Sequence, residues 1–243
     1  MTSVPFRPCI VIPTFDNPLT IAPVARAAAR HLDEVVIVDD GSAAPARGVI
    51  DELEAAGVAR VQRLARNRGK GAAVAAGFSF ARSAGYTHAF QIDADAQHDL
   101  ECIPKFLAAA AADPDALVVG YPVFDASAPS LRRSARHIAR FWVNLETGGA
   151  VVVDPMTGFR VYPLDTALAC GSLGAGMEFD IEVAVRMIWA GVRVINLPVG
   201  VRYLTREQGG VSHFRMVRDN VRISCLHARL ATTAVWRKVR ACC

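Results

Sequence analysis

The sequence of 243 residues lacks any segment that would place it in or across a membrane. No apolar run reaches the ~18 residues that a membrane span requires. No charged stretch followed by an apolar stretch stands at the N-terminus, so we expect no signal peptide. The net charge of +4 is too small to argue for nucleic acid by itself. Since 52% of the residues are hydrophobic and 21% are charged, we expect a globular chain.

Cysteine is sparse, and its spacing fits no metal site. The six cysteines are scattered, without the paired spacing of a zinc site. We therefore expect reduced, mostly structural thiols and a cytoplasmic protein. For the final pair, Cys242 and Cys243, lipidation and a frayed tail are both open, and the tail is the simpler interpretation. Internal repeats and low-complexity linkers are also lacking, which favours one domain.

The first half does contain a regular alternation of short β-branched apolar runs with alanine-rich helical stretches. This pattern predicts an α/β fold, in which a mostly parallel central sheet carries helices on both faces. The expected strands are residues 9–13, 35–38, 61–64, 89–92 and 117–119. The expected helices between and after them are residues 19–32, 46–56, 71–84 and 100–112.

The second half is less regular. Its expected elements are a helix at 130–145, a strand at 159–162, a helix at 178–190 and a strand at 192–197. The last helix is expected to begin near Ser212, a residue type suited to an N-cap. We thus divide the chain into a domain of residues 1–212 and a basic, amphipathic C-terminal helix and tail of residues 213–243.

Polar, turn-rich clusters follow each of the first four expected strands. In a parallel sheet, ligands bind beyond the carboxyl ends of the strands, so clusters in these positions should meet at one edge. Packing alone does not explain four of them. The clusters are PTFDN at 13–17, DDGS at 39–42, RNRGKG at 66–71 and DADAQH at 93–98.

Asp93 and Asp95 stand two residues apart just past the fourth expected strand, so both carboxylates are expected to face one cleft. They would repel each other there unless a divalent cation lay between them. Hard oxygen ligands suit Mg²⁺ or Mn²⁺, which in turn bind a diphosphate, and Gln97 can add a neutral oxygen. An isolated Asp-x-Asp is common and is more often a pair of solvated loop acids. Its position beside three further clusters favours the metal site.

Each of two other clusters allows both a functional and a purely structural interpretation. In the 39–42 cluster, Gly41 permits a tight turn where an acid can accept from a base N–H or a ribose hydroxyl. An ordinary turn capped by Ser42 is the alternative. The 66–71 cluster opens a helix, whose N-terminus favours anions. It is not a Walker loop, because its glycine spacing is wrong and no Ser or Thr follows Lys70, and a plain glycine-rich turn is the alternative.

Two further stretches complete a set of motifs, DPMTGFR at 154–160 and EFDIE at 178–182. Together with the four clusters, and in this order, they resemble glycosyltransferase family 2, and most of all its dolichyl-phosphate mannosyltransferase-like branch. The likeness covers nearly the whole chain up to the last helix, and its motifs are specific as a set but weak singly. It implies a single Rossmann-like GT-A domain that binds a nucleotide-sugar and transfers the sugar with inversion.

The resemblance also implies roles for individual residues. Contacts to the nucleotide-sugar are expected from Pro13, Thr14, Asp16, Asp39, Asp40, Lys70, Asp93 and Arg202. Asp40 would contact the base or ribose, and Arg202 lies in a loop, 202–213, that would close on the donor diphosphate. Mg²⁺ or Mn²⁺ would be held by Asp93, Asp95 and Gln97. The first motif reads Asp16-Asn17 where Asn-Glu is usual, which leaves the base contact open.

Bond formation needs a group that takes the proton of an acceptor hydroxyl. By its place in the 178–182 motif, Asp180 is the candidate base, and Asp95 is the second catalytic residue because its cation would stabilise the charge that grows on the diphosphate. The alternative for Asp180 is an acid favoured by the dipole at a helix N-terminus. A lipid-phosphate acceptor, already ionised, would need little help from a base.

Basic residues of the second half are the candidates for the acceptor side. Acceptor contacts are expected from Arg132, Arg136, Arg160, Ser212 and His213. The last helix carries an arginine stripe flanked by apolar residues, which suits either a membrane surface or a solvated basic face. The stripe consists of Arg215, Arg218, Arg222 and Arg229. We expect a lipophilic or lipid-linked acceptor and a protein held peripherally at the inner face of the plasma membrane.

Two other functions compete with this interpretation. A nucleotidyltransferase that forms a nucleotide-sugar would also use a glycine-rich loop and a metal, but its loop should follow the first strand directly, and residues 13–15 contain no glycine. A non-catalytic nucleotide-binding module would keep the fold but lose the chemistry. The intact Asp93, Asp95 and Asp180 argue against such decay.

Overall fold

The computed structural model describes residues 5–124, 130–149, 152–171, 173–205, 207–208 and 213–241. In this part of the chain a seven-stranded sheet has the order β3-β2-β1-β4-β6-β5-β7. Only β6 runs antiparallel to its neighbours, which confirms the mostly parallel sheet. The strands are β1 Pro8–Thr14, β2 Val35–Asp39, β3 Arg60–Arg63, β4 His88–Gln91, β5 Leu117–Phe124, β6 Arg160–Pro163 and β7 Val194–Val201.

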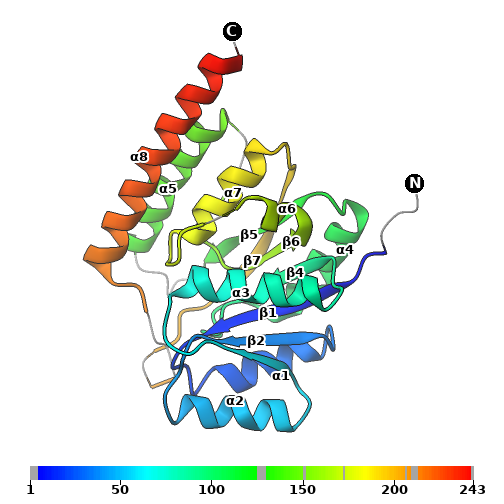
Figure 1. The fold of residues 1–243 in the computed structure, drawn as a ribbon. Coiled ribbons are helices and arrows are strands. Elements are labelled where there is room, and N and C mark those ends of the chain that lie inside the picture. Colours follow the sequence, from blue (N-terminus) through cyan, green and yellow to red (C-terminus); the bar gives the residue numbers. More distant parts are fainter. Residues whose placement is uncertain are drawn as a thin grey trace.

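Helices cover both faces of this sheet (Figure 1). Alternate residues of β1 enter two separate cores: Val11 packs on the side of α3 and α7, while Ile10 and Ile12 pack on the side of α1 and α4. Burial on both faces explains why the strands read as nearly continuous apolar runs. The helices are α1 Ile21–Ala29, α2 Ala46–Ala55, α3 Lys70–Ser83, the short 3₁₀ helix η1 Leu100–Cys102, α4 Ile103–Ala112, α5 Ser130–Thr147, α6 Leu164–Ala169, α7 Phe179–Trp189 and α8 Met216–Ala241.

Two features differ from the sequence-based expectation. The strand expected at 117–119 continues to Phe124, because β7 pairs with it residue by residue from Leu117–Val194 to Phe124–Val201. This pairing overrides the local signals of Gly120 and Pro122, which disfavour a strand. The six-residue helix α6 was not expected, since one and a half turns carry too little periodicity to be read from sequence.

The long helix α8 lies beside α5 at one side of the molecule, and its C-terminal end projects beyond the body (Figure 1). It begins at Met216 and not near Ser212, which lies outside the described residues. The Asp219 carboxylate accepts the Arg215 N–H at 2.7 Å and so fixes the first turn. Leu226 and Leu230 join the core of the α3 and α7 face. Among the described residues, no helix combines the length and apolar character needed to cross a membrane.

Candidate active site

A cavity of about 600 Å³ opens beyond the carboxyl ends of β1, β2 and β4. Since parallel strands end at the same edge, the loops that follow them meet here. All four polar clusters contribute to its lining, and so do the start of α7 and the start of α8. The lining residues that were expected to bind the donor, the metal or the acceptor are Pro13, Thr14, Asp40, Lys70, Asp93, Asp95, Gln97, Asp180 and His213.

At one end of the cavity, Asp40 holds the loop that leads into α3. Its two carboxylate oxygens accept the backbone N–H groups of Arg68 and Gly69, each at 2.8 Å. Burial raises the pKa of Asp40, and these two hydrogen bonds partly offset the rise. Gly69 has φ 101° and faces the Ala175 carbonyl oxygen, which a Cβ would approach to 2.5 Å, so only glycine fits this turn.

Two acids of the predicted nucleotide site lie outside the cavity lining and hold the β2–α2 turn instead. One oxygen of Asp39 accepts the Ser42 N–H at 2.8 Å, and the other pairs with Arg63 at 3.3 Å. Asp16 adopts φ 49° and accepts the Ala43 N–H at 2.9 Å. Their neighbours Phe15 and Asn17 line the cavity in their place.

The centre of the cavity floor is an ion-pair cluster around Lys70. Its ammonium nitrogen Nζ lies 2.8 and 3.0 Å from the two Asp93 oxygens and 2.9 Å from Asp180 Oδ2. Burial alone would lower the pKa of Lys70, but the carboxylates of Asp180 and Asp93 together raise it. Asp93 thus already has a cationic partner from the chain itself, which the sequence did not indicate, whereas Lys70 makes no ion pair with Asp95.

The two acids of the Asp-x-Asp pair have opposite pKa shifts. Burial tends to raise the pKa of Asp93, but Lys70 and His98 outweigh it and the pKa is lowered. The pKa of Asp95 is raised by burial and by the charge of Asp93. Asp95 makes no ion pair within the described chain; its Oδ1 accepts the Gln97 N–H at 3.1 Å. A carboxylate short of positive charge at this position fits a bound divalent cation.

The protein itself would supply only a few of the ligands of such a cation. In the described ranges, no group of three or more His, Cys, Asp or Glu side chains could hold a metal ion. The donors near one another are the two carboxylates of Asp93 and Asp95, with Gln97 at the same rim. A cation there would need further oxygens from a ligand such as a diphosphate, because Mg²⁺ demands six of them.

Asp180, at the start of α7, is held from several sides. It is 2% exposed, and its Oδ1 accepts a hydrogen bond from Gln91 Nε2 at 3.0 Å. Tyr162 in turn donates to Gln91 Oε1 at 3.1 Å, and Arg160 donates to the Asp180 backbone oxygen at 2.5 Å. Since Lys70 binds the other carboxylate oxygen, both oxygens of Asp180 are occupied.

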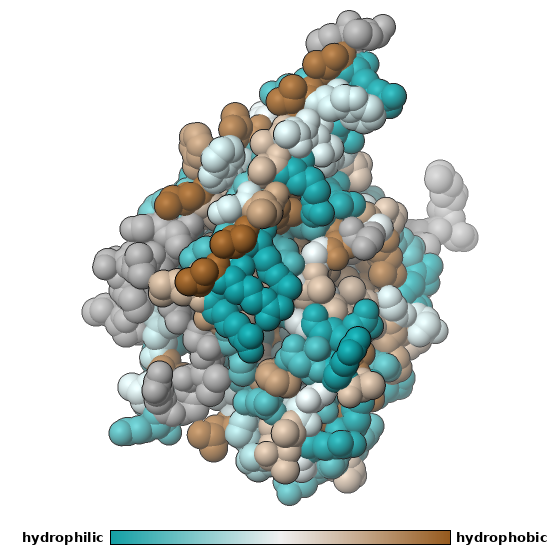
Figure 2. All heavy atoms as spheres, turned by 60° about the vertical axis from the view of Figure 1, so that its left-hand side comes forward, coloured by the Kyte–Doolittle hydropathy of each residue, from teal (hydrophilic) through white to brown (hydrophobic). Residues whose placement is uncertain are grey.

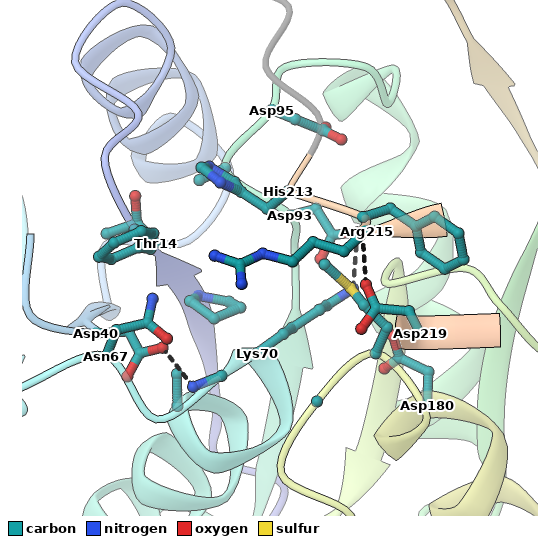
Figure 3. Close-up of a pocket in the computed structure, with 18 of the residues that line it drawn as sticks. Thr14, Asp40, Asn67, Lys70, Asp93, Asp95, Asp180, His213, Arg215 and Asp219 are labelled. Carbon is teal, nitrogen blue, oxygen red and sulfur yellow. Dashed lines mark hydrogen bonds and ion pairs between the residues drawn. The ribbon is translucent and has the colours of Figure 1, made fainter. Parts of the chain in front are cut away.

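The roof of the cavity comes from α8 and the residues just before it. Arg215 extends across the cavity towards the end that carries Thr14 and Asn67 (Figure 3). Arg218 and Arg222 also line the cavity. Within the described ranges these three guanidinium groups form no ion pair within 4 Å, and beside the single carboxylate of Asp219 they make this side of the cavity net positive. An anionic ligand would supply the missing charge.

The first three members of the arginine stripe therefore line the cavity, although Arg215 and Arg218 are also exposed. The expectation that the stripe lies on a membrane surface stays a prediction. The fourth, Arg229, pairs with the buried Glu182 at 2.7 Å. Spacing of three and four residues did place these side chains on one side of a helix. Which way that side faces follows from the docking of α8 on α5 and α7, which the sequence does not encode locally.

Comparison with known proteins identifies the family. The model of the family described as Glycosyl transferase family 2 matches residues 9–166, which is well over half of the chain. The chain belongs to this family. A polyprenol monophosphomannose synthase from Mycolicibacterium smegmatis is 28% identical over 233 residues, covering 89% of this chain and 83% of that protein. An undecaprenyl-phosphate mannosyltransferase from Micrococcus luteus is 28% identical over 218 residues, covering 84% and 86%.

Solved structures agree on the fold. Glucosyl-3-phosphoglycerate synthase from Mycobacterium tuberculosis, in complex with Mg²⁺ and uridine diphosphate, aligns with a TM-score of 0.69 at 15% identity, over 94% of this chain and 79% of that one. The same enzyme with Mn²⁺ and uridine-diphosphate-glucose gives 0.66 at 15% identity, over 94% and 78%. The predicted GT-A fold and family 2 glycosyltransferase are thereby confirmed, and the nucleotidyltransferase and the non-catalytic module are set aside.

In this family 2 enzyme, several residues expected at the donor or acceptor lie elsewhere. Arg160 is fully buried below the cavity, and Arg136 pairs with the buried Asp154. Arg202 is exposed, and its backbone N–H donates to the Gln97 carbonyl at 2.9 Å. The Arg132 side chain and Ser212 lie outside the described residues. His213 lines the cavity, with its ring 5.6 Å from that of Phe15.

Proposed function

We propose that this family 2 enzyme transfers a sugar, with inversion, from a nucleotide-diphosphate sugar to a lipid-linked anionic acceptor, and that it depends on Mg²⁺ or Mn²⁺. The observation that carries this proposal is the charge distribution of the cavity. Carboxylates line its floor at Asp93, Asp95 and Asp180, and unpaired arginines line its roof. A donor diphosphate and an acceptor phosphate both need positive charge, and a cation on the donor needs the carboxylates.

On the donor side, Thr14, Asp40 and Asn67 form the end of the cavity that suits a nucleoside. Arg215 points towards this end, where its guanidinium would pair with a phosphate (Figure 3). Asp93 and Asp95 would hold the cation, which when bound supplies positive charge to the leaving diphosphate. The tight loop ahead of α3 borders the same region, and Asp40 fixes its shape by accepting the Arg68 and Gly69 N–H groups.

On the acceptor side, we assign Arg218 and Arg222 to an anionic group, because they stand at the cavity roof without carboxylate partners. A phosphate acceptor attacks as an anion, so no group has to remove its proton. Asp180 would then act mainly by holding Lys70, which occupies one of its oxygens at 2.9 Å. For a hydroxyl acceptor, Asp180 is the base we propose, since it is the carboxylate nearest to the centre of the floor that a cation would leave free.

A membrane surface is the source of acceptor that the outer face of α5 and α8 suits best. Phe141 and Ile138 on α5 are 63% and 61% exposed, and Val217 and Val221 on α8 are 80% and 57% exposed. Figure 2 shows brown hydrophobic side chains spaced along the α8 column among teal ones. Exposed apolar residues beside basic ones are typical of helices that lie on an anionic lipid surface. The matched mannosyltransferases from the two bacteria are named for polyprenol and undecaprenyl phosphate, which supports such an acceptor.

The proposal is tested by a screen for nucleotide release. Purified enzyme would be mixed with nucleotide-sugars and with vesicles that carry a polyprenyl phosphate, with Mn²⁺, with Mg²⁺ or with EDTA. We expect release that needs both the lipid phosphate and the metal. Arg218→Gln should raise the KM for the lipid about tenfold, because a charge-assisted hydrogen bond contributes about 1.5–3 kcal/mol. Lys238→Gln, on the same helix but far from the cavity, should leave the KM unchanged. Full activity in EDTA, or a preference for neutral soluble acceptors, would contradict the proposal.

A further inference from the structure

Lys70 is shared between carboxylates that come from separate parts of the fold. Lys70 begins α3, Asp93 follows β4 and Asp180 lies in the first turn of α7. All three contacts of the ammonium nitrogen lie between 2.8 and 3.0 Å, two of them to Asp93 and one to Asp180. An ammonium group has three N–H donors, so these contacts use its full capacity.

Both oxygens of Asp93 thus lie in contact with the Lys70 ammonium group. In the described part of the chain, Lys70 is the sole ion-pair partner of Asp93, and Asp95 has none. A divalent cation that chelated both Asp93 oxygens would have to take the place of the ammonium group, and one bound to a single oxygen would still be repelled by it. The Lys70 ammonium therefore stands in competition with any cation at this position.

Of the three groups, Lys70 is the one free to move. Asp180 is fixed by Gln91, and Gln91 is fixed by Tyr162, and both of these partners are fully buried. Asp93 packs against the backbone of Gly158, where an added Cβ would lie 2.3 Å from its carboxylate oxygens. The lysine side chain lines the cavity on a flexible four-carbon stem, so it can turn while the carboxylates stay in place.

We propose that Lys70 is an internal counterion that competes with the divalent cation for Asp93, so that the cation binds tightly only together with a nucleoside diphosphate. The displaced ammonium group then pairs with the negatively charged diphosphate. Metal and nucleotide binding become coupled through one side chain, and in the free enzyme the ammonium group partly offsets the charge of Asp93 and Asp180. This inference rests on the metal dependence proposed above.

The test measures Mn²⁺ binding directly, from the electron paramagnetic resonance signal of free Mn²⁺. Titrations would be run with and without UDP or GDP, whichever the wild-type enzyme binds. We expect wild type to bind Mn²⁺ weakly alone and at least about tenfold more tightly with the nucleotide. Lys70→Met should bind Mn²⁺ alone about tenfold more tightly than wild type, because Asp93 is released. The dependence of Mn²⁺ binding on the nucleotide should shrink accordingly.

Controls separate this role from a structural one. Lys105→Met removes an exposed lysine on α4 and should change nothing. Lys70→Gln keeps hydrogen-bond donors without the charge, and it carries the test if Lys70→Met does not fold. In Lys70→Met/Asp93→Asn the gain should disappear.

Two results would overturn the inference, and they differ. If the folded Lys70 variants bind Mn²⁺ no more tightly than wild type does, while wild type still binds Mn²⁺ with nucleotide, the inference alone is wrong. If neither wild type nor the variants bind Mn²⁺, even with nucleotide, the proposed metal dependence fails and the inference fails with it.

Discussion

At the scale of single residues, Gly158 decides where the Asp93 carboxylate can lie. A Cβ at this position would stand 2.3 Å from both carboxylate oxygens, closer than any real contact. We expect Gly158→Ala to push Asp93 away from Lys70 and to lower sugar transfer at least about tenfold, since small misplacements of catalytic groups are costly. Steady-state nucleotide release with the donor found in the screen measures the effect.

Gly48→Ala is the matched control for this change. Gly48 lies on α2, and a Cβ there meets nothing within 4 Å. The control should keep its activity and gain slightly in stability, because alanine is the better helix former by about 1 kcal/mol. Equal activities in the two variants would show that the position of Asp93 does not matter for transfer.

The sequence placed many residues of the cavity correctly but not their partners. Thr14, Asp40, Asp93 and Asp180 were predicted from strand ends and motif order, and all four line the cavity. The pairing of Lys70 with Asp93 spans 23 positions and depends on how α3 docks against β4. Local spacing carries no information on such pairs, so the sequence indicates a metal, and not Lys70, as the cation beside Asp93.

At the scale of elements, a buried His227–Glu146 pair joins α8 to α5. His227 Nδ1 lies 2.8 Å from Glu146 Oε1, both side chains are nearly inaccessible, and burial raises the pKa of Glu146. We expect His227→Ala to destabilise the fold by about 3–5 kcal/mol, because it leaves a buried acid without its partner. Urea unfolding followed by circular dichroism measures this loss.

A double-mutant cycle distinguishes pairing from simple packing. Removing both partners in His227→Leu/Glu146→Leu should recover most of the lost stability, because no polar group is then stranded in the interface. The pairing would be contradicted if the effects of His227→Leu and Glu146→Leu were strictly additive in the double variant.

Helices and strands whose apolar residues recur with a clear period were predictable from the sequence. The way in which these elements pack against one another was not. The alternation in the first half gave the order of strands and helices up to β5, with ends within a few residues. The antiparallel insertion of β6 between β4 and β5 followed from no local pattern, since β6 is only four residues long. The division of the chain at residues 212 and 213 stays a prediction, because residues 209–212 lie outside the described part.

At the scale of the whole molecule, the cavity roof and the exposed apolar face belong to the same helix. The first turns of α8 carry Arg218 and Arg222 on the cavity side and Val217 and Val221 on the outer side. If the outer side of α8 lay on a lipid surface, that surface would therefore be next to the arginine-lined side of the cavity. This arrangement would let a phosphate enter the cavity while its hydrocarbon tail stays in the lipid.

We expect the enzyme to cosediment with vesicles that contain anionic lipid, and more weakly as salt is raised. Phe141→Glu and Val217→Glu should each weaken this binding about tenfold, because each removes an apolar group that the lipid would bury and adds repulsion from the lipid headgroups. Leu19→Glu is the control, since Leu19 is 62% exposed but lies next to α1, away from α5 and α8. Equal loss in all three variants would indicate an effect of net charge alone. Unchanged binding in the first two would place the membrane contact, and with it the entry of the acceptor, on another face of the molecule.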